Sequence, residues 1–253
     1  MMWHLIKLRR CGAALSLLLV LAGGSAWAQQ VQAPLPQVRF TIRAGPDGAI
    51  TAAAAIGSWL PSVLKNLPVA SCAACDPTHL WGVDRGTVGV GASDGPSNVA
   101  LYATVGGSAM LVALSRHGEP KALNATLEDA AVMAQVAAVD AFATQWLKVL
   151  FHRPRPERYT PQGAQFTTVE DSRSFPSGHA SFAFAAAAAA ASILHRRGVL
   201  HDHKLETILL FSGAAATAVL RVVAHRHFPT DVVAGALVGT AIGWAIPMLH
   251  PVR

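Results

Sequence analysis

Charged residues are scarce in this sequence. Asp, Glu, Lys and Arg make up 13% of the 253 residues, whereas an average soluble domain carries about a quarter. This deficit argues against a conventional, charged cytosolic enzyme, and with 52% hydrophobic residues the chain is neither disordered nor a coiled coil. The apolar fraction suffices for a large buried core or for several membrane spans.

Cysteine is also rare, with three residues. Cys11 lies near the N-terminus, so Cys72 and Cys75 remain as a Cys-Ala-Ala-Cys loop. A zinc site would need a second such pair, which the sequence lacks. In an exported protein this pair can form a small disulfide. A redox-active CxxC is the alternative, although no βαβ pattern surrounds it.

Acidic residues are the less frequent charges. Fourteen Asp and Glu against 20 Lys and Arg give a formal net charge of +6. A positive surplus suits nucleic acid, anionic lipid or phosphorylated small molecules. Charge alone does not choose among them, but the motifs described below favour a phosphorylated ligand and not nucleic acid.

The first 28 residues are organised like an export signal. A short basic stretch, residues 1–10 with Lys7, Arg9 and Arg10, precedes the apolar residues 11–23. Ala26-Trp27-Ala28 is typical of a signal peptidase site. The alternative is an uncleaved first membrane helix, because the apolar stretch is only slightly short of a span. In both cases the following residues emerge on the far side of the inner membrane.

Two regions follow this N-terminus. Residues 29–96 are rich in Pro, Gly and Asp, with one short apolar stretch at residues 52–60, and predict a partly irregular exported segment. In residues 97–253, apolar stretches alternate with short polar connections and strand signals are nearly absent, so we expect an all-α domain, a bundle of about five to six helices. The predicted helices cover residues 97–115, 127–150, 179–194, 205–224 and 231–249.

These helices suit a membrane better than a soluble core. Residues 232–249 are uncharged over close to the roughly 20 residues that a span requires. If the helices zigzag, the connections that carry Arg116 and Arg197 fall on one side, which is the positive-inside arrangement. The alanine run at residues 185–191 allows close helix packing in lipid. We expect an inner-membrane protein, with a soluble exported bundle as the alternative.

Polar clusters lie at the helix ends that the zigzag places together on the exported side. Lys148, Arg155 and Arg221 supply three positive charges, whose mutual repulsion is costly unless a multiply charged anion lies among them. Arg offers a planar fork to phosphate oxygens, and Lys a point charge. Ser177 and Gly178 precede an apolar helix, where a hydroxyl and free N–H groups bind anions. Together they predict a phosphate site.

Two histidines complete the predicted site. Asp231 lies four residues after His227 and can accept from one imidazole nitrogen, which leaves the other free to attack phosphorus. Pro229 keeps His227 in a loop, with Thr230 expected as the helix cap and Asp231 in the first turn. His179 then protonates the leaving oxygen and later activates water against the phosphohistidine.

These residues resemble the type 2 phosphatidic acid phosphatase family, which shares its site with bacterial class A acid phosphatases and vanadium haloperoxidases. The family's motifs KxxxxxxRP, PSGH and RxxxxxHxxxD are complete between Lys148 and Asp231. The resemblance implies a PAP2-like helical fold, with His179 as the acid, His227 as the nucleophile and Asp231 as its orienting partner. It also implies hydrolysis without a metal or other cofactor. It implies these phosphate-binding residues: Lys148, Arg155, Ser177, Gly178 and Arg221.

Neighbouring basic residues have simpler interpretations. His225 is the rival nucleophile, but its spacing to Asp231 and Arg221 fits the motif worse. Arg153 and Arg158 follow an apolar helix, and we interpret them as juxtamembrane anchors.

We therefore expect a phosphatase that hydrolyses phosphate monoesters or diphosphates of lipids through a phosphohistidine, on the periplasmic side of the bacterial inner membrane. A soluble periplasmic acid phosphatase acting on small phosphoesters is the closest alternative. A vanadium-dependent haloperoxidase and a non-enzymatic membrane scaffold are further ones. The exact substrate and the oligomeric state are not specified by the sequence.

Overall fold

The computed structural model describes residues 38–64, 67–69, 72, 74–91 and 93–253. The predicted export signal in residues 1–28 lies outside the described residues. Within the described part, every secondary-structure element is a helix. The β-type pairing there is one isolated bridge between Phe40 and Val252. The all-α prediction is confirmed.

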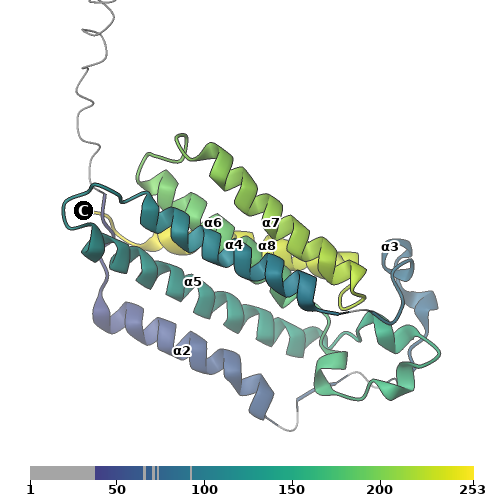
Figure 1. Ribbon diagram of the computed structural model, residues 1–253. Helices are drawn as coiled ribbons and strands as arrows, with labels where there is room; N and C mark the ends of the chain where they lie inside the picture. The colour runs from purple at the N-terminus through teal and green to yellow at the C-terminus, as the bar shows by residue number, and fades with distance from the viewer. Residues whose placement is uncertain (1–37, 65–66, 70–71, 73, 92) are drawn as a thin grey trace, which may run out of the picture. The chain divides into compact units, whose positions relative to one another are not determined.

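Five long helices follow one another in alternating directions (Figure 1). They coincide with the five predicted helices, and each is long and apolar enough to cross a membrane. The starts of three helices therefore share one end of the bundle with the ends of the other two. The helices are α4 (Gly95–Leu114), α5 (Ala122–Phe151), α6 (Gly178–Arg196), α7 (Lys204–Val223) and α8 (Pro229–Leu249).

The segment that we predicted as partly irregular contains a further long helix, α2 (Ala44–Val63), which packs along α5 (Figure 1). The side that α2 buries carries small residues such as Ala54 and Gly57, while Ile56 and Trp59 are exposed. A helix that buries small side chains has a weak apolar periodicity, which is why the sequence pattern does not reveal it. Two short helices, η1 (Pro77–His79) and α3 (Gly82–Arg85), precede α4.

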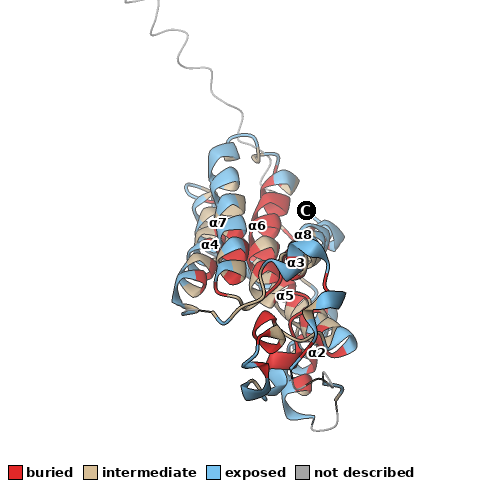
Figure 2. Ribbon diagram, turned by 90° about the vertical axis from the view of Figure 1, so that its right-hand side faces the viewer, coloured by how far each residue is buried: buried red, intermediate tan, exposed pale blue. Residues whose placement is uncertain are grey.

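Helix α6 is the centre of the bundle and packs against α4, α5, α7 and α8. All of residues 185–191 are buried, so α6 is covered on every side along the alanine run (Figure 2). Small side chains let the backbones of neighbouring helices approach, as the sequence predicts.

The closest approach is a seam of glycines between α8 and α6. Gly235, Gly239 and Gly243 recur at every fourth position of α8, and a Cβ atom at each would overlap a backbone carbonyl oxygen of α6. This seam sets the position of the start of α8, and the start of α8 carries Asp231.

Replacing Gly239 with alanine is expected to destabilise the bundle, because the added Cβ would overlap the Ser181 carbonyl and force the two helices apart. Overpacking of this kind costs about 1–3 kcal/mol. The measurement is the unfolding temperature in detergent. Gly106→Ala in α4 is the matched control, since a Cβ there meets nothing within 4 Å. Equal unfolding temperatures for the two variants would contradict the close seam.

Two of the basic residues that we assigned to the connections are buried at the opposite end of the bundle. The Arg116 guanidinium donates from Nε to Asp129 Oδ2 at 3.0 Å, and Arg197 donates to the same carboxylate. A buried carboxylate requires such partners because an unpaired buried charge is costly. Lys121 and Lys204 of these connections are exposed.

Candidate active site

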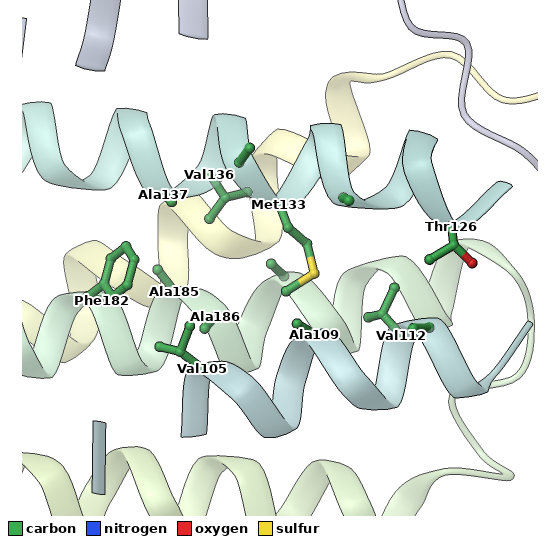
Figure 3. A pocket seen from close by; sticks show the side chains of 14 residues that line it. Val105, Ala109, Val112, Thr126, Met133, Val136, Ala137, Phe182, Ala185 and Ala186 are labelled. Carbon is green, nitrogen blue, oxygen red and sulfur yellow. The ribbon is translucent and has the colours of Figure 1, made fainter. Parts of the chain in front are cut away.

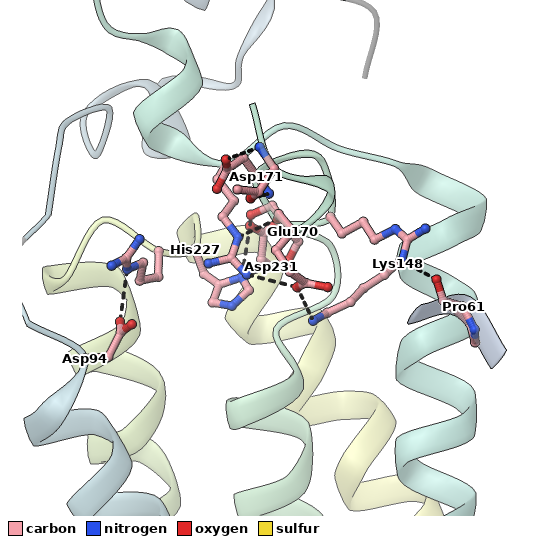
Figure 4. Close-up of polar contacts among 12 residues, drawn as sticks. Pro61, Asp94, Lys148, Glu170, Asp171, His227 and Asp231 are labelled. Carbon is pink, nitrogen blue, oxygen red and sulfur yellow. Dashed lines mark hydrogen bonds and ion pairs between the residues drawn. The ribbon is translucent and has the colours of Figure 1, made fainter. Parts of the chain in front are cut away.

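The polar clusters meet at the end of the bundle where α4, α6 and α8 begin (Figure 4). Lys148 lies in the last turn of α5, and a Cβ atom at Gly178 of α6 would lie 3.8 Å from its Nζ atom. The carboxylate of Glu170 lies 4.0 Å from Lys148 Nζ and 3.4 Å from Arg155 Nη2. The structure thus brings together the first motif and the start of the second.

Glu170 was not among the predicted site residues. Its backbone carbonyl accepts from Arg155 Nε at 2.8 Å, which fixes the guanidinium, while its side chain is 57% exposed. The carboxylate lies between two cations, at a place where another anion can take up the same contacts (Figure 4). The sequence signal is weak, because acidic residues in a polar loop are common.

The start of α6 has the geometry of an anion site. Ser177 is the N-cap residue, and the first intrahelical bond runs from Ser181 N to Ser177 O at 3.0 Å. The N–H groups of Gly178 and His179 precede that bond, and they lie at the positive end of the helix dipole. Lys148 adds a full positive charge beside them.

Arg221 lies in the last turn of α7 with 3% of its surface exposed. Its Nη1 atom donates to Asp94 Oδ1 at 2.9 Å and to Ser97 Oγ at 3.3 Å. Its Nε atom is buried and has no hydrogen-bond partner among the described residues. Because an unsatisfied buried N–H group is costly, this guanidinium is suited to an additional oxygen ligand.

His227 occupies the loop between α7 and α8 and is 1% exposed. Its Nδ1 atom lies 2.8 Å from the carbonyl oxygen of Ser174. A carbonyl oxygen only accepts, so Nδ1 carries the proton and Nε2 keeps its lone pair. Burial, with smaller contributions from Arg155 and Arg221, lowers the pKa of His227 to about 3. The imidazole is therefore neutral at neutral pH, as a nitrogen nucleophile must be.

Asp231 lies in the first turn of α8 as predicted, but its contacts differ from the predicted ones. Its Oδ2 atom is 3.7 Å from His227 Nδ1, whereas it accepts from Phe228 N at 2.9 Å and from Ser174 Oγ at 2.5 Å. A carboxylate at this position of a helix reaches back to the preceding backbone N–H. Asp231 thus holds the residue after His227 and the side chain of Ser174, and the Ser174 carbonyl is the direct imidazole partner.

The interpretation of Arg153 and Arg158 as membrane anchors is wrong. Arg153 donates to Asp231 Oδ1 at 2.6 Å and to Asp84 Oδ2 at 2.8 Å, and its guanidinium lies 4.2 Å from the centroid of the Phe228 ring. Arg158 is buried and donates to Phe166 O at 2.7 Å. Arg153 thus satisfies two buried carboxylates from distant segments, which local sequence does not reveal.

Thr230 is not the helix cap that we expected, because α8 begins one residue earlier, at Pro229. Proline is favoured at the first helical position, where no N–H donor is needed. Asp84 of α3 replaces the expected cap: it accepts from Thr230 N at 3.1 Å and from Thr230 Oγ1 at 2.7 Å. The short helix α3 thereby fixes the start of α8.

His225 lies apart from this arrangement. Its Nδ1 atom lies 2.8 Å from the carbonyl oxygen of Thr87, in the segment that follows α3. Gly89 lies so close to the imidazole that a Cβ there would come within 2.8 Å of it. His225 therefore holds the segment that follows α3, which favours His227 as the nucleophile.

Cys72 and Cys75 form a disulfide, the first of the two interpretations of this pair. Cys75 N donates to Arg158 O at 2.8 Å, and the carbonyl oxygen of Cys72 accepts from the Arg158 guanidinium. The disulfide therefore supports the loop that carries Arg155, at the same end of the bundle as the site. In the described part of the chain, no group of three or more His, Cys, Asp or Glu side chains is arranged to hold a metal ion.

The fold and site define an all-helical protein with five candidate membrane spans and an anion site at one end. Residues 129–253, which contain all three motifs, match the family model described as the PAP2 superfamily. The superfamily generally comprises phosphatases, so this match suggests phosphoester hydrolysis. Comparisons with curated proteins and with solved structures gave no match.

Proposed function

We propose that the protein is a membrane phosphatase that cleaves phosphate monoesters or diphosphates of lipids through a phosphohistidine on His227. The observation that carries this proposal is the state of His227. The imidazole is buried and neutral, Nδ1 is held by a carbonyl oxygen and Nε2 is left as the free nucleophile. Lys148, Arg221 and the start of α6 lie at the same end of the bundle, and the charges of Arg155 and Arg221 act on the imidazole.

In the first step, Nε2 of His227 forms a bond to phosphorus, and the bond from phosphorus to the leaving oxygen breaks. Lys148, Arg155, Arg221 and the N–H groups of Gly178 and His179 stabilise the charge on the other phosphoryl oxygens. His179 gives its proton to the leaving oxygen. Before this step the Glu170 carboxylate gives up its contacts with Lys148 and Arg155, and its exposure leaves room to turn into solvent.

In the second step, His179 takes a proton from water while the water oxygen attacks phosphorus. The bond between phosphorus and His227 Nε2 breaks, and inorganic phosphate leaves. Asp231 and Arg153 take no part in either bond change. Asp231 holds the Ser174 hydroxyl and the Phe228 N–H group and is itself held by Arg153, so the imidazole stays aligned through both steps.

A lipid substrate is supported by an apolar cavity between α4, α5 and α6 (Figure 3). It has a volume of about 260 Å³ and apolar walls that include Val105, Ala109 and Met133. Phe182, at its edge nearest the site, is one turn along α6 from His179. An aliphatic tail fits such a cavity while its phosphate lies at the start of α6.

A periplasm-facing site is supported by two features at opposite ends of the bundle. The disulfide lies beside the site, and disulfides persist in oxidising compartments. The connections with Lys121 and Lys204 lie at the other end, which suits the positive-inside rule.

The test is phosphate release from a panel of lipid and soluble phosphoesters, measured separately in purified membranes and in the detergent-free supernatant. We expect activity in the membranes, with lipid phosphates preferred. Activity that appears in the supernatant with soluble phosphoesters alone would identify a soluble acid phosphatase instead. Absence of phosphate release from every substrate would refute the proposed function.

Filling the apolar cavity should separate the two substrate classes. Ala109→Phe places a large ring where the tail would lie, so kcat/KM for a long-chain lipid phosphate is expected to fall by about tenfold or more, the cost of losing a few buried methylene groups. The rate with p-nitrophenyl phosphate should stay unchanged. Met110→Phe is the control, because Met110 is 61% exposed and does not line the cavity. A parallel loss with both substrates would count against the cavity as the tail site.

A further inference from the structure

The first turn of α4 lies outside the family match at residues 129–253, yet it contacts two residues of the site. Asp94 and Ser97 accept from Arg221 Nη1 at 2.9 and 3.3 Å. One helical turn on from Asp94, Asn98 Oδ1 lies 2.9 Å from His179 Nε2. A segment that the sequence motifs do not include thus forms one wall of the site.

Asp94 is a fixed anchor for Arg221. Although burial acts in the opposite direction, the charges of Arg221 and Arg226 lower the pKa of Asp94. Its Oδ1 atom also accepts from Arg226 Nε at 3.0 Å, so the carboxylate is held from two sides. These contacts hold the start of α4, which places Asn98 against His179.

The contact with Asn98 specifies the protonation of His179. A carboxamide oxygen only accepts, so Nε2 of His179 donates and carries a proton. Nδ1 is then the nitrogen left for chemistry. When the ring is charged, Nδ1–H can be given to a leaving oxygen. The neutral ring that results still donates from Nε2 to Asn98, and its Nδ1 can take a proton from water.

We propose that Asn98 is a positioning residue for acid–base catalysis, which holds His179 with Nε2 protonated so that Nδ1 exchanges the proton with the leaving group and with water. This inference rests on the proposed function, in which His179 is the acid. Asn98 itself does not touch the reacting atoms. Its effect reaches the reaction through the orientation and the tautomer of one imidazole.

The test is Asn98→Leu, which keeps the side-chain volume and removes the acceptor. The readout is kcat/KM for an alkyl phosphate and for p-nitrophenyl phosphate, because kcat/KM reports transfer to His227 and not the later hydrolysis. The alkyl leaving group needs a proton, so its kcat/KM should fall about tenfold to a hundredfold, within the range of acid–base catalysis. The aryl leaving group needs little help, so its value should change less than about threefold.

Two further variants separate positioning from folding. Asn98→Asp keeps an acceptor oxygen and is expected to restore most of the alkyl phosphate activity. Ser108→Ala removes a buried side-chain hydrogen bond further along α4 and should leave both substrates unchanged. Equal losses with both substrates in Asn98→Leu, or no loss with either, would overturn this inference. A wild-type protein without activity on either substrate would instead refute the proposed function.

Discussion

His227→Ala is expected to abolish phosphate release, with a loss on the order of 10⁴-fold or more, because it removes the proposed nucleophile. The structure makes this imidazole hard to replace. Its Nδ1 atom is held at 2.8 Å by Ser174 O, and its burial keeps it neutral, with a pKa of about 3. The measurement is single-turnover and steady-state phosphate release in membranes.

The matched control is His225→Ala. His225 lies two positions away and its Nδ1 atom contacts Thr87 O, so its removal loosens a supporting loop but leaves the nucleophile. We expect most of the activity to remain. If His225→Ala abolished phosphate release and His227→Ala did not, the nucleophile would be misassigned.

The covalent step can be observed directly. In a His179→Ala variant, hydrolysis of the intermediate loses its base, while p-nitrophenyl phosphate still transfers its phosphoryl group without an acid. A labelled phosphoryl group should therefore accumulate on His227 and be absent when both histidines are replaced. Full release without accumulation would argue for direct attack by water.

Arg221→Ala is expected to lower kcat/KM by about 10²–10³-fold, the range found when a charge-stabilising donor is removed. Arg221 is 3% exposed, and its Nη1 atom is held by Asp94 and Ser97. The remaining N–H groups are thus fixed in place before the charge on the phosphoryl oxygens develops. Arg221→Lys should not restore activity, because an ammonium lacks the planar fork.

Arg226 offers the control for this prediction. Its Nε atom donates to the same Asp94 carboxylate oxygen at 3.0 Å, and its Nη1 atom lies 3.3 Å from Glu157 Oε2. Arg226→Ala removes an equal charge from the same neighbourhood and is expected to cost less than about tenfold, since Arg226 does not hold the phosphoryl group. Equal losses in the two variants would mean that Arg221 acts through general charge alone.

The positions of the long helices follow directly from the amino-acid order. Each of the five apolar stretches became a helix within a few residues of its predicted bounds, because a long apolar run between polar connections satisfies its backbone best as a helix. Helix α2 escaped the prediction because small residues line the side that it buries. Whether a segment forms a helix is thus decided locally, whereas which side of the helix is buried depends on the neighbouring helix.

The groups of the proposed phosphate site were also visible in the chain. Lys148, His179 and His227 stand in motifs whose spacing places them at helix ends, and an antiparallel bundle brings such ends together. The partners of these residues were not visible. Ser174 O and Asn98, the partners of the two histidines, lie far from them in the chain, as Asp94 does from Arg221. A carbonyl or a side-chain amide carries no sequence signal of such a role.

Helix positions, the zigzag of the chain and the types of group at the site end were therefore set by the order of apolar and polar residues. The tertiary structure decided which nitrogen of His227 is free, that Arg153 supports Asp231 and that α4 holds His179 and Arg221. The reason is physical: apolar periodicity acts over neighbouring residues, but a buried polar group must find its partner wherever packing brings one within hydrogen-bond distance.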